Sequence, residues 1–484
     1  MPFRLSLAQL TAANILIDCF SLDAFGVASY LARHGARHVR IVDAGPLPAE
    51  LRGQAEALQA LGVTLMPETD PESLAHDYDL IFADLFLQPR RPFIQAARAR
   101  GVMVTTHADL ILQLSPLPVI GVTGSAGKSS STLLVCDALR AAGQQVCRGW
   151  DSIMENLWPN YEILAELDEL HPPGWLVLEL TSSHLEYMHA SPHIALVTVL
   201  WPDHVDWHGS LDRYFATKRV ILDHQSADDW AILNADDERQ RTTFVPAVRG
   251  RLAWYSRTQA VTPGVFVRGD QIVARWQERE FAIAPLAAAP VRNVHVPNIL
   301  AGATAALVAG VEVEALAQAI AEFKGLPHRL EAVGSYRGVT VYADGLAITP
   351  GKARAGLEAF PDRSLVFIAG GLVASNYSDG LHSSPEEQAL VTAACEAAAR
   401  KARRVVLFGE SAARLRAEWL AAGRSAAEAH LVPDLRAAVE AALELAAPPD
   451  SILFAPIYFI WPDERLVLNQ VLRERLAALG QEPA

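Results

Sequence analysis

The apolar residues of this chain fall into short runs that alternate with longer amphipathic stretches. Near the N-terminus, runs at 13–20 and 38–45 predict buried strands, and the stretch 22–35, which ends in glycine, predicts a helix between them. A strand at 78–85 and a helix at 90–101 continue the series. A β–α–β opening of this kind predicts a parallel sheet covered by helices.

The alternation stops where Pro116 and Pro118 favour an extended linker, and it resumes twice after that point. The second series contains strands at 118–124, 174–180 and 193–200, a helix at 128–143, and an alanine-rich helical region from 298 to about 325. The third contains strands at 338–345, 364–371, 403–410 and 451–457, separated by alanine-rich helices. We therefore predict an α/β protein of three domains, with boundaries at 1–116, 117–326 and 327–484.

Composition narrows the class of protein. The chain has 484 residues and a formal net charge of −14, which argues against binding to a nucleic-acid backbone. Its four cysteines have no paired spacing, so we expect free thiols, without a zinc site or a disulfide framework. Neither a signal-peptide pattern nor a membrane-spanning apolar run is visible, so we expect a cytoplasmic protein without a membrane partner.

The stretch GVTGSAGKSSSTLLV, residues 121–135, joins a predicted strand to a predicted helix through two closely spaced glycines. The backbone N–H groups of such a loop and the start of the helix are suited to bind phosphate. A lysine at this place would neutralise β- and γ-phosphate oxygens, and the serines after it offer a hydroxyl to Mg²⁺. A turn without a ligand is the alternative, but the offsets of the lysine and serines favour a nucleotide site. The residues predicted to bind the nucleotide are Gly124, Ser125, Ala126, Gly127, Lys128, Ser129 and Ser130.

The loop has only two residues between its glycines, a short form that resembles the Mur ligases and the related folylpolyglutamate synthases. Four further motifs carry the resemblance along the chain, and they are most similar to the glutamate-adding branch of the Mur family: LVLELTSSHLE, PDHVDWHGSLDRYFATKRVIL, ILNADDE and GLPHRLEAV. The resemblance implies a Rossmann-like N-terminal domain for a UDP-sugar-type substrate, a central P-loop ATPase and a Rossmann-like C-terminal domain for an amino acid or amine. It also implies an ADP-forming amide ligase of peptidoglycan precursor synthesis that activates a carboxylate as an acyl phosphate.

The same resemblance implies two Mg²⁺ ions and a set of ligands for them. Glu179 ends an apolar strand, at the sheet edge where ligands of α/β proteins bind. His204, in WPDH, matches a metal-binding histidine of the family, and Ser129 supplies the hydroxyl. Lys218, in YFATKRV, matches a lysine that is carbamylated in the family and so becomes a carboxylate. A solvated carboxylate, a structural histidine and a surface lysine are the alternatives.

Three more residues are expected at the nucleotide by resemblance. Asn298 matches an asparagine beside it, Arg329 would contact the γ-phosphate, and Asp344 would bind the ribose. Asn234 to Asp237, in ILNADDE, is predicted to be a structural turn. We predict that the residues carrying catalysis are Lys128, Glu179, His204, Lys218 and Arg329.

Both predicted substrate sites depart from the family pattern. Leu346 and Ala374 stand where the family has lysines, and Ile460 stands where it has a serine. In the N-terminal domain the glycine-rich turn is reduced to Gly26, although Asp43 could still bond a uridine or ribose. The family's asparagine-bearing segment after the central helix reads RGWDS here.

Four functions remain open at this point. The main prediction is a monomeric ligase that joins a small-molecule carboxylate, such as UDP-N-acetylmuramoyl-alanine, to an amino acid or amine. A relative recruited to another carboxylate and amine would explain the altered substrate positions. A nucleotide-binding homologue without ligase activity would explain them too, but it would not need Glu179, His204, Lys218 and Arg329 together. A folylpolyglutamate-type ligase fits DHVDWHG and GLPHRLE less well.

Overall fold

The computed structural model describes residues 5–43, 51–67, 77–83, 92–148, 163–276, 279–288, 296–372, 385–461 and 463–478. The chain divides into two compact units. The first consists of residues 1–200, 212–289 and 297–323, and the second consists of residues 201–211, 290–296 and 324–484.

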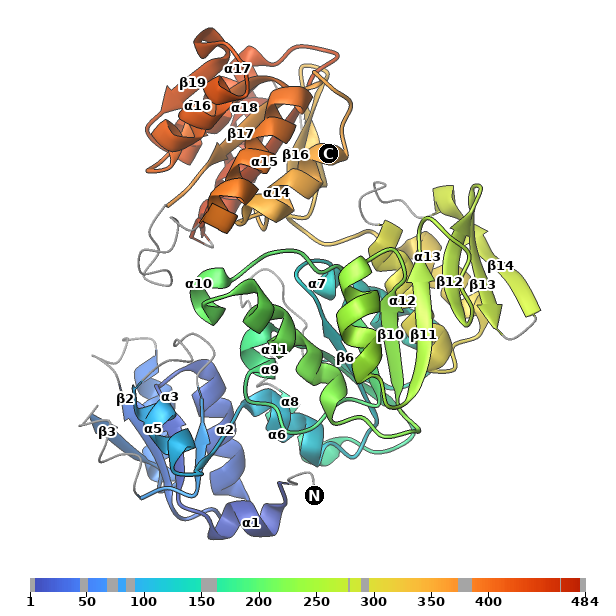
Figure 1. Cartoon of the computed structure of the whole chain (residues 1–484). Helices are drawn as coiled ribbons and strands as arrows, with labels where there is room; N and C mark the ends of the chain where they lie inside the picture. The colour runs from blue at the N-terminus through green and yellow to red at the C-terminus, as the bar shows by residue number, and fades with distance from the viewer. Residues whose placement is uncertain are drawn as a thin grey trace. The chain divides into compact units, whose positions relative to one another are not determined.

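The N-terminal part of the first unit is a five-stranded parallel sheet, drawn in blue in Figure 1, with the order β3-β2-β1-β4-β5. Helix α2 packs on β1 and β2, and α5 packs on β5. The central strand is buried throughout and apolar except for its last residue, as expected for a strand covered on both faces. The elements are β1 (Ile15–Asp18), β2 (Val39–Asp43), β3 (Thr64–Pro67), β4 (Leu80–Phe82), β5 (Met103–Thr105), α1 (Leu7–Ala12), α2 (Leu22–Arg33), α3 (Arg52–Ala60), α5 (Pro92–Ala99) and α6 (His107–Leu114).

The central part of the chain builds a nine-stranded sheet with the order β14-β13-β12-β11-β10-β9-β6-β8-β7. The strands from β7 to β12 pair in parallel, whereas β12, β13 and β14 form antiparallel pairs. Its strands are β6 (Val119–Thr123), β7 (Val146–Arg148), β8 (Trp175–Glu179), β9 (Ile194–Val197), β10 (Trp230–Asn234), β11 (Arg251–Ser256), β12 (Gly264–Arg268), β13 (Gln271–Trp276) and β14 (Arg279–Pro285). The helices of this stretch are α7 (Lys128–Ala141), α8 (Ile163–Glu166), α9 (Ser182–Leu185), α10 (Val205–His208), α11 (Leu211–Asp223), α12 (Val296–Val308) and α13 (Val313–Glu322).

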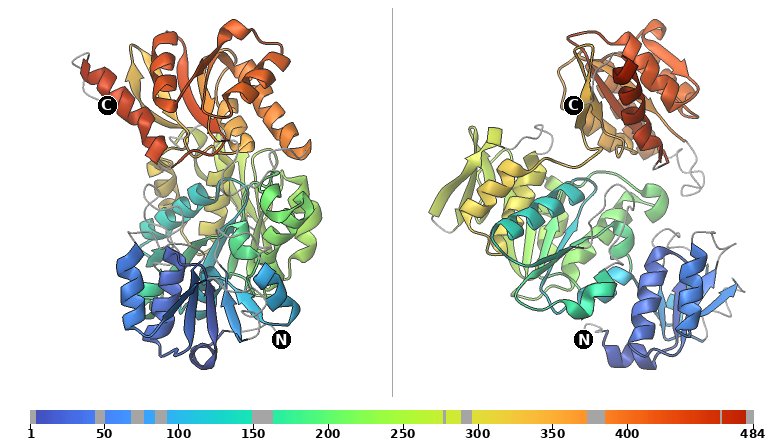
Figure 2. Two further views of the ribbon diagram at one scale, coloured as in Figure 1. Left: turned by 90° about the vertical axis from the view of Figure 1, so that its left-hand side faces the viewer. Right: turned by 180° about the vertical axis from the view of Figure 1, so that it is seen from behind.

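The C-terminal part of the second unit is a six-stranded sheet with the order β15-β16-β20-β17-β18-β19, in which only the β15–β16 pair is antiparallel. The side chains of β17 alternate between two apolar clusters, one under α14, α15 and α16 and the other under α17 and α18. Figures 1 and 2 show these helices on opposite faces of the sheet. The elements are β15 (Glu331–Tyr336), β16 (Val339–Ala343), β17 (Leu365–Gly370), β18 (Ala402–Phe408), β19 (Ala429–Val432), β20 (Ser451–Ile457), α14 (Pro350–Glu358), α15 (Pro385–Lys401), α16 (Ala412–Ala421), α17 (Leu435–Leu445) and α18 (Val467–Ala478).

The α/β class and the strands and helices predicted from the apolar pattern are confirmed. The antiparallel strands β13 and β14 were not predicted, although the turn between β12 and β13 contains Gly269 and Asp270. The predicted turn after β10 is confirmed as structural, because Asp236 accepts hydrogen bonds from Ser256 and Thr258. The four cysteines are free. Within the described ranges, no helix is long and apolar enough to cross a membrane.

Candidate functional site

The glycine loop lies at the carboxyl end of β6, between the neighbouring strands β8 and β9. Gly124 has a φ of +148°, and Gly127, which caps α7, has a φ of +86°. Both values are disfavoured for residues with a side chain. A Cβ atom at Gly124 would collide with the Thr198 hydroxyl, and one at Gly127 would collide with the Asn298 amide. The two glycines therefore allow the side chains of Thr198 and Asn298 to lie directly against the backbone of the loop.

Residues that follow β9 and a side chain of α11 hold the loop in place through hydrogen bonds. The Ser125 N–H donates to the Val199 carbonyl at 2.8 Å, and the Thr198 hydroxyl donates to the Ala126 carbonyl at 2.6 Å. The Ser125 hydroxyl lies 2.8 Å from the Tyr214 hydroxyl. Sequence reasoning missed Thr198 and Tyr214, because the order of strands brings Thr198 to the loop and the packing of α11 brings Tyr214 there.

Gly127→Ala is expected to lower ATP affinity by about 10-fold or more, because the substitution forces a strained φ and pushes against Asn298. ATP binding is measured by calorimetry, and folding by circular dichroism. Gly143→Ala is the matched control: Gly143 also has a positive φ, but a Cβ atom there meets nothing within 4 Å. Equal losses of ATP affinity in the two variants would contradict the role given to this contact.

Lys128, Ser129 and Glu179 meet at this edge of the sheet. The Ser129 hydroxyl donates to Glu179 Oε2 at 2.7 Å, and Lys128 Nζ lies 3.9 Å from Glu179 Oε1. Lys128 Nζ also donates to the Gly124 carbonyl at 3.1 Å, so its stem curls back over the loop. Glu179 reaches the pair because β8 lies beside β6 in parallel register. Ser130 is buried in α7, and the Ser131 hydroxyl donates to the backbone carbonyl of Asn298 at 3.0 Å.

Lys218 lies in the buried face of α11, and only 2 % of it is exposed. Its ammonium is 5.0 Å from the centre of the Tyr214 ring, a cation–π distance. His184, in α9, is affected by the charges of both lysines. Its pKa is lowered well below its usual value by burial and by the positive charges of His107, Lys128 and Lys218. Lys218 is therefore no surface lysine, and His184 is a neighbour that the sequence did not reveal.

His184 also contacts the N-terminal part of the same unit. Its ring centre is 5.0 Å from that of His107, the first residue of α6. His107 Nδ1 in turn lies 3.6 Å from a carboxylate oxygen of Asp23 in α2. Burial raises the pKa of Asp23 to about 7. A buried row of Asp23, His107 and His184 thus leads from the N-terminal sheet toward the lysines of the central one.

From the raised pKa of Asp23 we predict how the stability of the protein depends on pH. Because the folded pKa lies above the unfolded one, the native state binds the proton more strongly, and stability falls as pH rises from about 4 to 7. The Asp23→Asn variant does not have this loss. The free energy of unfolding of the variant minus that of the wild type should therefore increase by about 2 kcal/mol from pH 5 to pH 8. Urea unfolding at the two pH values measures this. Asp228→Asn, at an exposed aspartate, should show no such difference.

His204 belongs to the second unit and lies in the segment 201–211. It is exposed and has a φ of +49°, which is rare for a residue with a side chain. Its N–H donates to Asp203 Oδ1 at 3.1 Å, and its Nε2 lies 3.7 Å from Asp203 Oδ2. Asp203 therefore orients the histidine. Glu179, Ser129 and Lys218 belong to the first unit.

Arg329 and Asp344 also belong to the second unit, at the carboxyl end of β16. Asp344 is 5 % exposed, and burial raises its pKa to about 7 although the charge of Arg329 opposes the rise. Arg329 Nη1 donates to the Leu346 carbonyl at 3.3 Å. A Cβ atom at Gly356 in α14 would meet an Asp344 carboxylate oxygen at 2.6 Å, so the carboxylate lies against the backbone of that helix.

The residues that depart from the family pattern differ in where the structure places them. Leu346 and Ile460 are buried, and Ile460 packs in the apolar cluster under α17 and α18. Ala374 lies outside the described residues, as do all but the first residue of RGWDS at 148–152. Asp43 ends β2.

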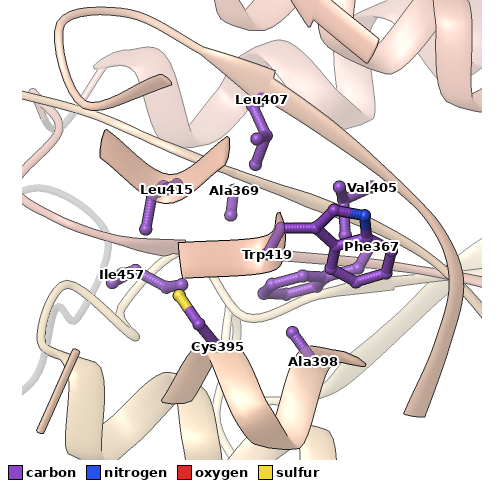
Figure 3. Close-up of a pocket in the computed structure, with 9 residues that line it drawn as sticks. All are labelled: Phe367, Ala369, Cys395, Ala398, Val405, Leu407, Leu415, Trp419 and Ile457. Atoms are coloured by element: carbon purple, nitrogen blue, oxygen red, sulfur yellow. The ribbon is translucent and has the colours of Figure 1, made fainter. Parts of the chain in front are cut away.

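The C-terminal sheet holds a cavity of about 10 Å³ that does not fit a substrate. Figure 3 shows its apolar lining, in which Trp419 and Leu415 of α16 face Cys395 of α15. The space has room for the centre of one water molecule. Burial raises the pKa of Cys395 to about 12, so the thiol is inert. We regard this cavity as a packing defect of the core.

Among the described residues, no group of three or more histidine, cysteine, aspartate or glutamate side chains is placed to hold a metal ion. The predicted metal set was Ser129, Glu179, His204 and Lys218. The structure brings Ser129 and Glu179 into contact, and it buries Lys218 in the same unit.

Comparison with known proteins covers most of the chain. Residues 122–289 match the Mur ligase middle domain, and residues 328–457 match the Mur ligase, glutamate ligase domain. A UDP-N-acetylmuramoylalanine–D-glutamate ligase of Symbiobacterium thermophilum is 35 % identical over 429 residues, which cover 87 % of this chain and 88 % of that protein. One of Koribacter versatilis is 30 % identical, with 92 % of each chain covered.

Solved structures with the same fold are those of other Mur ligases. MurF of Thermotoga maritima in complex with ADP gives a TM-score of 0.59 at 16 % identity and covers 97 % of both chains. MurF of Acinetobacter baumannii gives a TM-score of 0.60 at 15 % identity, with 94 % of this chain and 93 % of that chain covered. The protein belongs to the Mur ligase family and has its three-domain α/β architecture.

Proposed function

We propose that the protein is an ATP-dependent, ADP-forming ligase that joins the carboxylate of UDP-N-acetylmuramoyl-alanine to the amino group of D-glutamate. The observation that carries the proposal is the contact of Ser129 and Glu179 beside Lys128, in front of the glycine loop. The names of the relatives support the choice of substrates. We further propose that it acts as a monomer in the cytoplasm and does not bind nucleic acid or a membrane.

The glycine loop fits a nucleotide. Gly124 and Gly127 hold positive φ values in the loop, and the side chains of Thr198 and Asn298 lie against them. The N–H groups of the first turn of α7 lack partners within the helix, and they favour a negative charge. We assign the phosphates to this turn and to Lys128. Asn298 is assigned to the nucleotide because its amide faces Gly127.

A hydroxyl and a carboxylate in contact are hard oxygen ligands of the kind that Mg²⁺ prefers, so Ser129 and Glu179 fit the ion. Bound Mg²⁺ would neutralise charge on the phosphoryl group during transfer. We assign Lys218 and His204 to a second ion. For Lys218 this requires carbamylation: its neutral amine attacks the carbon of CO₂, an N–C bond forms, and one proton is released. Arg329 is assigned to the γ-phosphate and Asp344 to the ribose.

The reaction proposed has two steps. A carboxylate oxygen of the acceptor attacks the γ-phosphorus of ATP, which forms an acyl phosphate and releases ADP. The neutral amine of the second substrate then attacks the acyl carbon, phosphate leaves, and the nitrogen loses a proton. Lys128 contributes by holding a fixed positive charge where negative charge develops.

A second candidate is the same chemistry with another amine. Leu346 and Ile460 are buried and apolar, so neither can bind a carboxylate of the incoming substrate. The test is an assay of ADP release with UDP-N-acetylmuramoyl-L-alanine and a panel of amines, with the products identified by mass spectrometry. We expect D-glutamate to support the fastest turnover. Turnover with another amine only would favour the second candidate, and ADP release with no amide product would overturn both.

A further inference from the structure

Arg465 is a buried cation at the carboxyl end of the C-terminal sheet. It lies in the short helix η9 (Asp463–Leu466), which follows β20, and only 6 % of it is exposed. Its Nε and Nη2 are buried and have no hydrogen-bond acceptor among the described residues. A guanidinium remains charged at any physiological pH, so a desolvated one without a partner is strongly unfavourable.

The neighbours of Arg465 do not compensate its charge. Burial, and then the positive charge of Arg329, lower its pKa. The pKa of His328 is lowered too, by burial first, with Glu331 raising it and Arg465 lowering it. The stem of Arg465 lies beside Gly345, where a Cβ atom would be 3.4 Å from Arg465 Cγ.

Two carboxylates of the neighbouring segments have other contacts. Glu331 accepts the N–H of His328 at 2.8 Å, and Asp344 is subject to the charges of Arg329 and Lys352. Asp463 and Glu464 stand beside Arg465 in η9, but neither accepts a hydrogen bond from its Nε or Nη2. A buried positive charge without such a partner, in a chain whose formal net charge is −14, indicates that an anion binds there.

The geometry of the two unpartnered nitrogens indicates which kind of anion. Nε and Nη2 lie on one edge of the planar guanidinium, so their N–H bonds point in the same direction. This edge matches the two oxygens of a carboxylate or of a phosphate, with two parallel hydrogen bonds. A single water molecule could satisfy one donor but would leave the charge.

We propose that Arg465 binds an oxyanion of a substrate, and that this oxyanion is a carboxylate of the incoming amino acid. The inference rests on the proposed function. Arg465 lies eight residues beyond residues 328–457, which match the glutamate ligase domain, and it belongs to the same C-terminal sheet domain, the one assigned to the amino acid. The other source of the same chemistry is the terminal phosphate of ATP. Arg465 is thus a specificity residue that sequence reasoning did not single out.

The test compares Arg465→Met and Arg465→Lys with the wild type in the ligase assay, with each substrate varied separately. For Arg465→Met we expect KM for D-glutamate to rise about 10- to 100-fold, because a charge-assisted bidentate contact is lost. KM for ATP and for the UDP-sugar substrate should stay within about 2-fold of the wild type. Arg465→Lys should recover part of the affinity. Arg473→Met, at an exposed arginine of α18, is the matched control.

A second measurement separates substrate binding from a structural role. Without ligands, Arg465→Met should melt at the same or a higher temperature than the wild type, because the variant removes an uncompensated buried charge. D-Glutamate should raise the melting temperature of the wild type and not of Arg465→Met. A lower melting temperature together with an unchanged KM for D-glutamate would overturn the proposal.

Two other outcomes are distinguishable. A rise in KM for ATP alone would overturn the assignment to the amino acid and give the oxyanion site to the nucleotide. If the wild type forms no amide at all, the proposed function has failed. The anion site at Arg465 is then tested by the melting experiment alone, with D-glutamate and inorganic phosphate as probes. If neither probe raises the melting temperature of the wild type, the proposal of an anion site is overturned.

Discussion

Lys128→Ala is expected to lower kcat for ADP release about 10²- to 10³-fold, the effect of removing one group that stabilises developing charge. Lys128 is the cation at the glycine loop, where its ammonium lies 3.1 Å from the Gly124 carbonyl and 3.9 Å from Glu179. Alanine leaves the helix intact, because it is the best helix former. The loss should therefore appear in turnover and ATP affinity, while the circular dichroism spectrum is unchanged.

Lys324→Ala serves as the matched control for this variant, because Lys324 is an exposed lysine. It should keep the turnover of the wild type within about 2-fold, as most exposed substitutions do. If Lys128→Ala retained wild-type turnover and bound ATP normally, the nucleotide site would have to lie elsewhere.

Lys218→Ala is expected to lower kcat on the order of 10²- to 10³-fold, because it would remove a ligand of the second ion together with the carbamate that makes it one. We expect a specific role for Lys218 because it is buried, which is unusual for a lysine. Its charge, like that of Lys128, also acts on His184. Acetate or formate, added at millimolar concentration, should restore part of the activity by replacing the missing carboxylate. Turnover is measured with and without the added acid.

Two controls distinguish the carbamate from an ammonium at Lys218. Lys218→Arg keeps a positive charge and should stay as inactive as Lys218→Ala. Removal of CO₂ and bicarbonate from the buffer should lower the activity of the wild type. Full activity of Lys218→Arg would show that a cation is needed at this place, and the carbamate would be abandoned.

The glycine loop could be predicted from the sequence because its signals are local. A strand, two glycines, a lysine and a helix follow one another within 121–135, and each of these features is a short-range property of the chain. The structure confirms the strand β6 and the helix α7, and it adds that Gly127, which caps α7, has a positive φ. Glu179 could be placed as well, since the end of a buried strand in an α/β protein lies at the ligand-binding edge.

Contacts between distant strands could not be predicted, because they depend on the order of strands in the sheet. Tyr214 and Thr198 hold the loop only because β9 lies next to β6 and α11 packs behind it. His184 looked like part of a family motif. Its link to His107 requires the N-terminal part of the unit to pack against α9, which no local pattern encodes.

The burial of Arg465 could not be predicted from the sequence. In the sequence it stands in PDERL, a polar stretch before a helix, which is typical of an exposed helix start. Its burial depends on the turn after β20, which brings its stem beside Gly345. Burial of a charged residue is decided by tertiary packing, so it becomes visible only when the sheet is assembled.

The central claim is that the protein activates a carboxylate as an acyl phosphate. The most direct test uses UDP-N-acetylmuramoyl-L-alanine labelled with ¹⁸O in its carboxylate, together with ATP and D-glutamate, and follows the label in the phosphate that is released. The account predicts that each phosphate released with an amide carries one labelled oxygen from the carboxylate. Amide formation that releases only unlabelled phosphate would contradict it.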